Sequence, residues 1–172
     1  MQQTGAVISG SAALLLLHDV EFTPCDLDFY VAARGFASVL SFVQKFGYEI
    51  DSPDIASGQY DSLQLIVIKL VHRVSKKSIN VVTNLKGHVV GMITQFHSTL
   101  VMNYIAFYGV VSLYPYWTLR REGLMIQDTW STRACFAKYK NRGFRITKYM
   151  SELAKSLPEH DCTKDPYCPI YI

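Results

Sequence analysis

The sequence predicts an α/β (α+β) fold: a short mixed β-sheet flanked by helices. Apolar residues recur at helical spacing in some stretches and alternate with polar ones in others, and the two kinds of stretch follow one another along the chain. The 172 residues are 49% hydrophobic and 18% charged, which is typical of a folded domain that buries a core. We expect a single domain over residues 1–157 and a C-terminal tail over 158–172.

Short strands and helices alternate in the first half of the chain. Ser11 is placed to cap the apolar run that follows it, and Gly47 lies where a glycine commonly ends a helix. Pro24 has no N–H to donate and suits a position just before a strand. The expected elements are a strand-like segment at 6–8, a helix from Ser11 to His18 or Asp19, a strand at 26–31, a helix at 34–46 and a loop at 51–60.

The second half begins with two apolar runs joined by a polar turn, which together predict a β-hairpin. Later, residues 98–119 contain no charged side chain and are long enough to cross a bilayer. Asn103, Gly109 and Pro115 favour a buried helix-plus-strand segment, and a membrane-inserted segment is the alternative. The other expected elements are strands at 62–74 and 79–83, a helix at 86–96 capped by Asn84, a turn at 120–123 and helices at 132–141 and 147–156.

The strongest candidate for a functional site is a small-residue turn followed by paired carboxylates. Gly10 permits close approach of the backbone to a ligand, and a helix that begins at Ser11 offers free N–H groups to a phosphate. On the next strand, the alternation of side chains puts Asp26 and Asp28 on one face. Two neighbouring carboxylates repel each other unless a cation lies between them, so the pattern indicates a divalent metal beside a phosphate. The alternatives are a plain N-cap at Ser11 and two solvated carboxylates on an edge strand.

The ordered motifs Gly10-Ser11 and Asp26-Leu27-Asp28 resemble the signature of the polymerase-beta-like nucleotidyltransferase superfamily. More loosely, the whole chain resembles the nucleotidyltransferase-fold proteins of mushroom-forming fungi. The resemblance implies a magnesium-dependent enzyme that transfers a nucleotidyl group from a nucleoside triphosphate to an acceptor hydroxyl. It implies that Gly10 and Ser11 hold the β- and γ-phosphates, and that Asp26 and Asp28 are catalytic residues that hold Mg²⁺.

The resemblance places a third carboxylate on the strand at 79–83, where this sequence has Asn80. An asparagine carbonyl can ligate Mg²⁺, but it carries no charge and cannot accept a proton from an attacking hydroxyl. We therefore assign Asn80 as a weak metal ligand. The alternative function is a catalytically inactive binding or scaffold protein of the same fold. Glu21, Asp61 and His72 are other candidates for the missing base.

Three further groups of side chains have both a structural and a functional interpretation. Basic residues around the last helices suit a solvated face or a triphosphate contact. A group of aromatic residues suits the core or stacking on a base, and a group of cysteines with a histidine suits a packed tail or a zinc site. The residues are Lys138, Lys140, Arg142, Arg145 and Lys148; Tyr114, Tyr116 and Trp117; and Cys135, His160, Cys162 and Cys168.

Composition limits the partners and the compartment. The net charge of +3 is compatible with phosphate-bearing ligands but gives no strong nucleic-acid signal. No basic residue precedes Arg34 and the first apolar run is short, which argues against a secretory signal. Four scattered cysteines predict a reduced, intracellular setting, in the cytoplasm. The expected partners are thus a nucleoside triphosphate and an unidentified acceptor, with no membrane.

Overall fold

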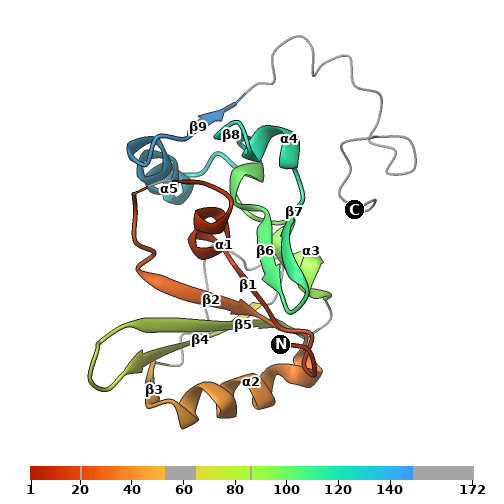
Figure 1. Cartoon of the computed structure of the whole chain (residues 1–172), viewed down its shortest axis with the longest axis vertical. Helices are drawn as coiled ribbons and strands as arrows, with labels where there is room; N and C mark the ends of the chain where they lie inside the picture. Colours follow the sequence, from red (N-terminus) through yellow and green to blue (C-terminus); the bar gives the residue numbers. More distant parts are fainter. Residues whose placement is uncertain (20, 53–64, 86, 149–172) are drawn as a thin grey trace.

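A seven-stranded mixed β-sheet forms the centre of the fold (Figure 1). The computed structural model describes residues 1–19, 21–52, 65–85 and 87–148. The order of strands across the sheet is β3-β4-β5-β2-β1-β6-β7, and β8 and β9 pair in parallel as a separate sheet. The strands are β1 Val7–Ser9, β2 Asp26–Tyr30, β3 Tyr48–Ser52, β4 Leu65–His72, β5 Ser78–Asn84, β6 Asn103–Ala106, β7 Gly109–Ser112, β8 Glu122–Leu124 and β9 Arg145–Thr147.

Helices lie on both sides of the large sheet, so the predicted fold class is confirmed. In Figure 1, α2 lies on one side of the sheet, whereas α1 and α5 lie on the other. The helices are α1 Ser11–Leu16, α2 Ala33–Lys45, α3 Val89–Ile93, α4 Pro115–Thr118 and α5 Trp130–Asn141, with a 3₁₀ helix, η2, at Thr99–Val101.

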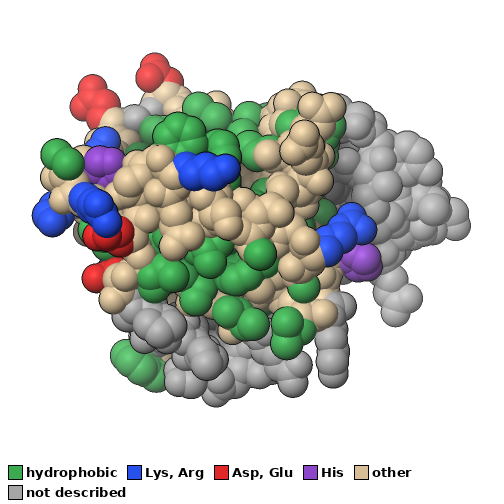
Figure 2. Space-filling view, turned by 90° about the horizontal axis from the view of Figure 1, so that it is seen from below, with side chains coloured by type: hydrophobic (Ala, Val, Ile, Leu, Met, Phe, Trp, Pro, Cys, Tyr) green, Lys and Arg blue, Asp and Glu red, His purple; other side chains and the backbone are tan. Residues whose placement is uncertain are grey.

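The sheet face under α2 is buried by the apolar stripe of that helix. Val39 and Val43 of α2 belong to one core cluster with Leu70 of β4 and Val81 of β5. Each such side chain contributes about 1.5–3 kcal/mol when it is fully buried. Figure 2 looks onto this side of the molecule and shows apolar side chains over much of the surface.

The opposite face of the sheet carries Asp26, Asp28 and Tyr30, which alternate along β2. Tyr30 is buried in a core cluster that also contains Leu14 of α1 and Tyr139 of α5. The two aspartates come before Tyr30 in the strand and are half-buried. They therefore lie at the margin of this core, beside α1 and α5.

The sequence correctly predicts the hairpin and two of the helices. β2 is a central strand: it runs antiparallel to β1 and parallel to β5. β4 and β5 form the expected antiparallel hairpin. The helices expected at 34–46 and 132–141 are present as α2 and α5.

Two elements in the first half differ from the prediction by more than one residue at an end. The helix from Ser11 ends at Leu16 instead of continuing to His18 or Asp19. The expected loop at 51–60 includes two residues of an edge strand, β3, which pairs with β4. The prediction missed β3 because its polar residues follow directly on a helix-ending glycine. Residues 53–64, which hold the rest of the expected loop, lie outside the described residues.

Three boundaries in the second half also differ. The helix expected at 86–96 is reduced to α3, and His88 is its N-cap. Asn84, the expected cap, instead ends β5. Its side-chain oxygen accepts a hydrogen bond of 3.1 Å from the Gly87 N–H. In the turn expected at 120–123, Arg121 has a φ of +61° and β8 begins at the next residue. Thr147 ends β9 and does not begin a helix.

The uncharged passage at 98–119 contains η2, β6, β7 and α4, in agreement with a helix-plus-strand segment. Within the described ranges, no helix combines the length and the apolar character that a membrane crossing requires. The tail at 158–172, with His160, Cys162 and Cys168, lies outside the described residues. The domain boundary at 157 stays a prediction.

Candidate functional site

Strand pairing brings the predicted site residues together. In the register of the sheet, Asp28 of β2 lies opposite Ser9 of β1 on one side and opposite Asn80 of β5 on the other. Because paired residues point to the same face of a sheet, the side chains of Asp28 and Asn80 lie next to each other. Gly10 follows Ser9 directly, so the small-residue turn adjoins Asp28.

Gly10 permits a close approach between this turn and the carboxylate. Its φ of +71° lies in the left-handed region that favours glycine. A Cβ atom at this position would lie 2.9 Å from Asp28 Oδ2, so any side chain would fill the space beside the carboxylate. Gly10 is also the N-cap of α1. The prediction that Ser11 caps this helix is wrong, since Ser11 is its first residue and is buried.

Asp28 is a buried carboxyl with an altered pKa. Burial raises its pKa from 3.8 to about 6, and a hydrogen bond of 2.7 Å from Asn80 Nδ2 to Asp28 Oδ1 opposes the rise. The charge of Asp26 raises this pKa further, whereas the charge of Lys138 lowers it. Because burial outweighs the hydrogen bond, the ionised carboxylate is unfavourable in the free protein and a nearby cation would stabilise it.

The donor set fits a magnesium ion that also binds phosphate. Among the described residues, no group of three or more His, Cys, Asp or Glu side chains is placed to hold a metal ion. In proteins, however, Mg²⁺ commonly binds one or two carboxylates together with substrate phosphates and water. Asp26 and Asp28 supply two carboxylates on one face, and the space that a Cβ of residue 10 would fill adjoins Asp28.

The side of the site at Asn80 is neutral or positive. Lys69 of β4 lies opposite Asn80 and therefore on the same face of the sheet. Its ammonium group is 3.5 Å from a carboxylate oxygen of Asp51 in β3. Across the sheet, Asp28 is thus followed by the amide of Asn80 and then by the ion-paired ammonium group of Lys69. No local sequence pattern marks Lys69, because its place beside Asn80 depends on the register of the hairpin.

The other candidate bases do not join this group. His72 lies near the turn of the β4–β5 hairpin, where its Nδ1 accepts a hydrogen bond of 3.0 Å from the Ser75 N–H. Its ring packs against Tyr48, with 5.0 Å between the centroids. Glu21 is exposed, in the connection between α1 and β2. Asp61 lies outside the described residues.

α5 carries Lys138, a cation that the sequence assigns only to a larger basic group. The charge of Lys138 lowers the pKa of Asp28, and burial together with the charge of Lys138 lowers the pKa of His97 to about 4. Burial raises the pKa of the Tyr139 phenol, and the charges of Asp28 and Asp26 raise it further. No local pattern distinguishes Lys138 from its neighbours, since its electrostatic effect on Asp28 depends on where the fold places α5.

The remaining predicted groups do not join the aspartates. On α4, the rings of Tyr116 and Trp117 pack edge to face at 5.0 Å, and the guanidinium of Arg120 lies 3.8 Å from the centre of the Tyr116 ring. These contacts give the aromatic residues a structural role. Cys135 of α5 is a half-buried free thiol, and the other proposed zinc ligands lie outside the described residues.

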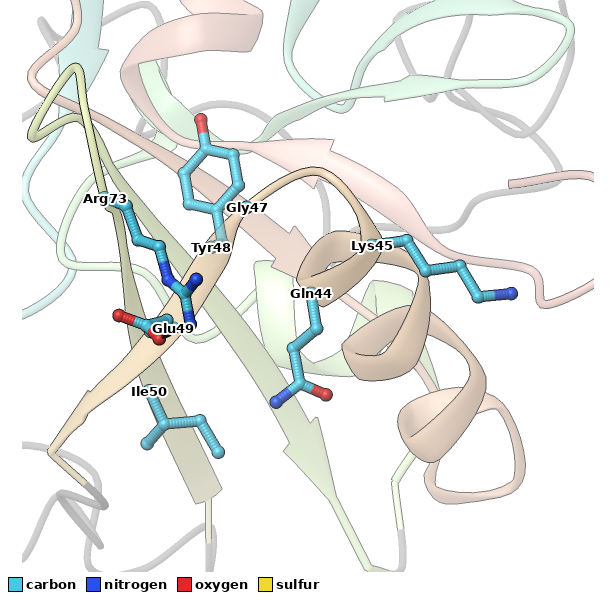
Figure 3. A pocket seen from close by; sticks show the side chains of 7 residues that line it. All are labelled: Gln44, Lys45, Gly47, Tyr48, Glu49, Ile50 and Arg73. Carbon is cyan, nitrogen blue, oxygen red and sulfur yellow. Dashed lines mark hydrogen bonds and ion pairs between the residues drawn. The ribbon is translucent and has the colours of Figure 1, made fainter.

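A separate hollow of about 510 Å³ lies between the end of α2 and the edge strand β3 (Figure 3). An ion pair between Arg73 and Glu49 forms part of its wall. Neither aspartate of β2 lines it, so this hollow is distinct from the candidate site. Its lining residues are Gln44, Lys45, Gly47, Tyr48, Glu49, Ile50 and Arg73.

Several solved structures share the fold of this chain. A Thermotoga maritima CCA-adding enzyme complexed with tRNA matches with a TM-score of 0.61 and 12% identity, over 90% of this chain and 37% of the enzyme. A CCA-adding enzyme in complex with CTP matches with a TM-score of 0.56 and 15% identity, over 83% and 36%. A tRNA-processing enzyme in an apo form matches with a TM-score of 0.57 and 11% identity, over 86% and 40%.

These likenesses show a nucleotidyltransferase-type fold. No family model matches the chain, and no characterised protein matches it in sequence. The chain spans about two fifths of the length of the solved structures. The comparisons do not support the narrower resemblance to fungal proteins. Two of the matched structures are a tRNA-processing enzyme and an enzyme complexed with tRNA, so they do not support taking the weak nucleic-acid signal of the composition as evidence against such a partner.

Proposed function

We propose that this chain binds a nucleoside triphosphate with Mg²⁺ and positions it for transfer of the nucleotidyl group to an acceptor hydroxyl. The observation that carries the proposal is the contact between two motifs that are far apart in the sequence. The backbone of the Gly10 turn approaches Asp28 so closely that a Cβ would lie 2.9 Å from its Oδ2. The fold shared with a CCA-adding enzyme that was solved with CTP supports the proposal.

Each residue has a distinct role in this proposal. The backbone N–H groups at Gly10 and Ser11 donate hydrogen bonds to the β- and γ-phosphates. Asp26 and Asp28 hold Mg²⁺, which supplies positive charge beside the α-phosphate. Asn80 orients Asp28, because it binds one carboxylate oxygen while the other faces Gly10. We favour this orienting role over metal ligation, since the amide nitrogen is the atom that faces the carboxylate.

A second candidate function is nucleotide binding without transfer. The observation that favours it is Asn80, which occupies the position beside Asp28 where a third carboxylate is expected. An amide cannot accept the proton of the acceptor hydroxyl. Under this second function, the same site binds the nucleotide and the chain acts as a binding or scaffold domain.

A pyrophosphate-release assay tests the proposal. The wild type is incubated with Mg²⁺, each nucleoside triphosphate in turn and, as the first acceptor, a tRNA that lacks its 3′-terminal nucleotides. This acceptor is chosen because one of the structures that share the fold is a CCA-adding enzyme complexed with tRNA. We expect pyrophosphate from the wild type and none from the Asp26→Ala/Asp28→Ala variant. Equal release from both proteins would contradict the assigned site.

The variant Asn80→Asp separates the two functions. It places a carboxylate within hydrogen-bond distance of Asp28, at the position that the nucleotidyl-transfer site otherwise lacks. If the wild type binds nucleotide but releases no pyrophosphate, and Asn80→Asp does release it, the binding function is the correct one. If the wild type already releases pyrophosphate, the transfer function holds without a third carboxylate.

A further inference from the structure

The hollow beside α2 has an open strand edge in its wall (Figure 3). β3 is the last strand of the large sheet, so one side of its backbone has no strand partner among the described residues. Tyr48, Glu49 and Ile50 all line the hollow. Because consecutive side chains of a strand point to opposite faces, a hollow lined by all three lies along the edge of β3. An extended segment in this hollow would be placed to pair with β3.

The two faces of the sheet that meet at this edge differ in character. The register pairs Ile50 with Leu70, which lies in the core under α2, so Ile50 faces that side. Although it is apolar, Ile50 is 44% exposed. Glu49 precedes it and faces the other side, where it forms an ion pair with Arg73. One face of the edge is therefore apolar, and the other carries charge.

Cations outnumber carboxylates around this edge. Each of the two carboxylates of β3 already has a basic partner on β4 or just after it. Three further lysines are exposed and form no ion pair in the part of the chain that the structure describes: Lys45 at the end of α2, and Lys76 and Lys77 in the turn after β4. The hydrogen bond and charge of Arg73 lower the pKa of Glu49, and the nearby charge of Lys76 lowers it further. This surplus of positive charge favours an acidic partner.

We propose that the edge of β3 and the hollow beside it bind an extended peptide in which apolar and acidic residues alternate. The peptide adds to β3 as a further strand. Its apolar side chains lie on the α2 side, one of them in the hollow against Ile50, and its acidic side chains lie beside Arg73 and the lysines of the turn. Neither aspartate of β2 lines the hollow, so this inference does not depend on the proposed function.

Two features favour a peptide over a nucleic acid strand or a membrane surface. The open edge of β3 presents a row of backbone N–H and C=O groups, which another extended backbone satisfies and a lipid surface does not. Tyr48 is the aromatic residue of the lining, and its ring packs against His72 and the core under α2. Among the described residues of the lining, no free ring is therefore offered for stacking on a base.

Fluorescence anisotropy with labelled synthetic peptides tests the proposal. The first peptide alternates valine with glutamate, the second has the same composition with all valines before the glutamates, and the third alternates valine with lysine. We expect the alternating acidic peptide to bind saturably and the block peptide to bind roughly tenfold more weakly, because only the first places an apolar side chain in the hollow and its acids beside the cations. The lysine peptide is expected not to bind.

Matched variants locate the binding. Arg73→Ala should weaken binding of the alternating acidic peptide roughly fivefold, the upper value for an exposed ion pair. Ile50→Asp should abolish it, because it puts a carboxylate where the apolar side chain lies. Arg145→Ala is the control: Arg145 is 69% exposed, as is Arg73, and also pairs with a glutamate, but it lies on β9. We expect this control to bind as the wild type does, and all three variants to keep the wild-type melting temperature, since the replaced side chains are exposed.

The outcomes decide both the place and the class of partner. The inference is wrong if no peptide binds the wild type, if the block peptide binds as tightly as the alternating one, or if Arg145→Ala weakens binding as much as Arg73→Ala. An oligouridylate strand and phosphatidylserine vesicles are tested in parallel. If either binds with a dependence on Arg73 and the alternating peptide does not bind, the class of partner is wrong.

Discussion

Replacing Asp28 by asparagine should stabilise the metal-free protein while it removes a metal ligand. Burial raises the pKa of Asp28 from 3.8 to about 6, so the ionised carboxylate destabilises the folded state at neutral pH. One pKa unit corresponds to about 1.4 kcal/mol, and the shift therefore costs about 3 kcal/mol. Asparagine removes the charge and keeps an oxygen to accept the hydrogen bond from Asn80. For a domain of this size we expect the melting temperature to rise by roughly 6–12 °C.

The pH dependence of this gain gives the reasoning a second test. Because the folded pKa of Asp28 lies above its unfolded value, the folded state binds more protons between about pH 4 and pH 6, and wild-type stability falls as the pH rises through that window. Asp28→Asn lacks the titrating carboxyl, so its stability does not fall in this way. The gain in stability should therefore be small at pH 4 and complete above pH 6.

Thermal or urea unfolding in the presence of a chelator measures the effect. Unfolding curves of both proteins are recorded at pH 4 and at pH 7, and Asp26→Asn is compared as a substitution of the neighbouring carboxylate on the same face of β2. A gain that is equal at both pH values would show that burial of the charge is not its cause. A melting temperature at pH 7 that is equal to or below that of the wild type would refute the account of Asp28.

Three further predictions follow from the described contacts. Gly10→Ala should lower the free energy of unfolding by about 1–2 kcal/mol and abolish nucleotide binding, because a Cβ at φ +71° meets Asp28 Oδ2. Denaturant titration measures the loss of stability, and calorimetry measures the loss of binding. Thr129→Ala should cost about 1 kcal/mol through loss of the capping box with Thr132 and leave nucleotide binding unchanged. Burial lowers the pKa of His97 from 6.5 to about 4, so the wild type should lose stability as the pH falls from 6.5 to 4. His97→Gln should show a smaller loss, which melting curves recorded from pH 7 to pH 4 measure.

Local patterns were sufficient to predict the strands and helices that build the site. The alternation in Asp26–Val31 and the continuous apolar character of the hairpin predicted strands, because a strand must bury one or both faces. The apolar stripe at 34–46 and the glycine that follows it predicted α2 in the same way. The resemblance also placed the strand at 79–83 beside the paired aspartates, and β5 pairs with β2 there.

Features that depend on distant packing were not predictable from these patterns. β3 is an edge strand. Its Asp51 pairs with Lys69 on β4, and its Glu49 pairs with Arg73 just after β4. Polar strands of this kind resemble loops in sequence. Asn84 looks like a helix cap because it precedes an apolar run, yet the ladder with β4 extends the strand to include it. Lys138 is one of several lysines on a polar helix, and its electrostatic effect on Asp28 depends on where the fold places α5.

The most direct test of the account is a calorimetric titration of the wild type and of Asp26→Ala/Asp28→Ala with Mg²⁺ and a nucleoside triphosphate. If the Gly10 turn and the two aspartates form one binding site, the wild type should give a saturable heat that depends on Mg²⁺, and the double variant should give none. Equal heats from the two folded proteins would show that these residues do not bind the nucleotide.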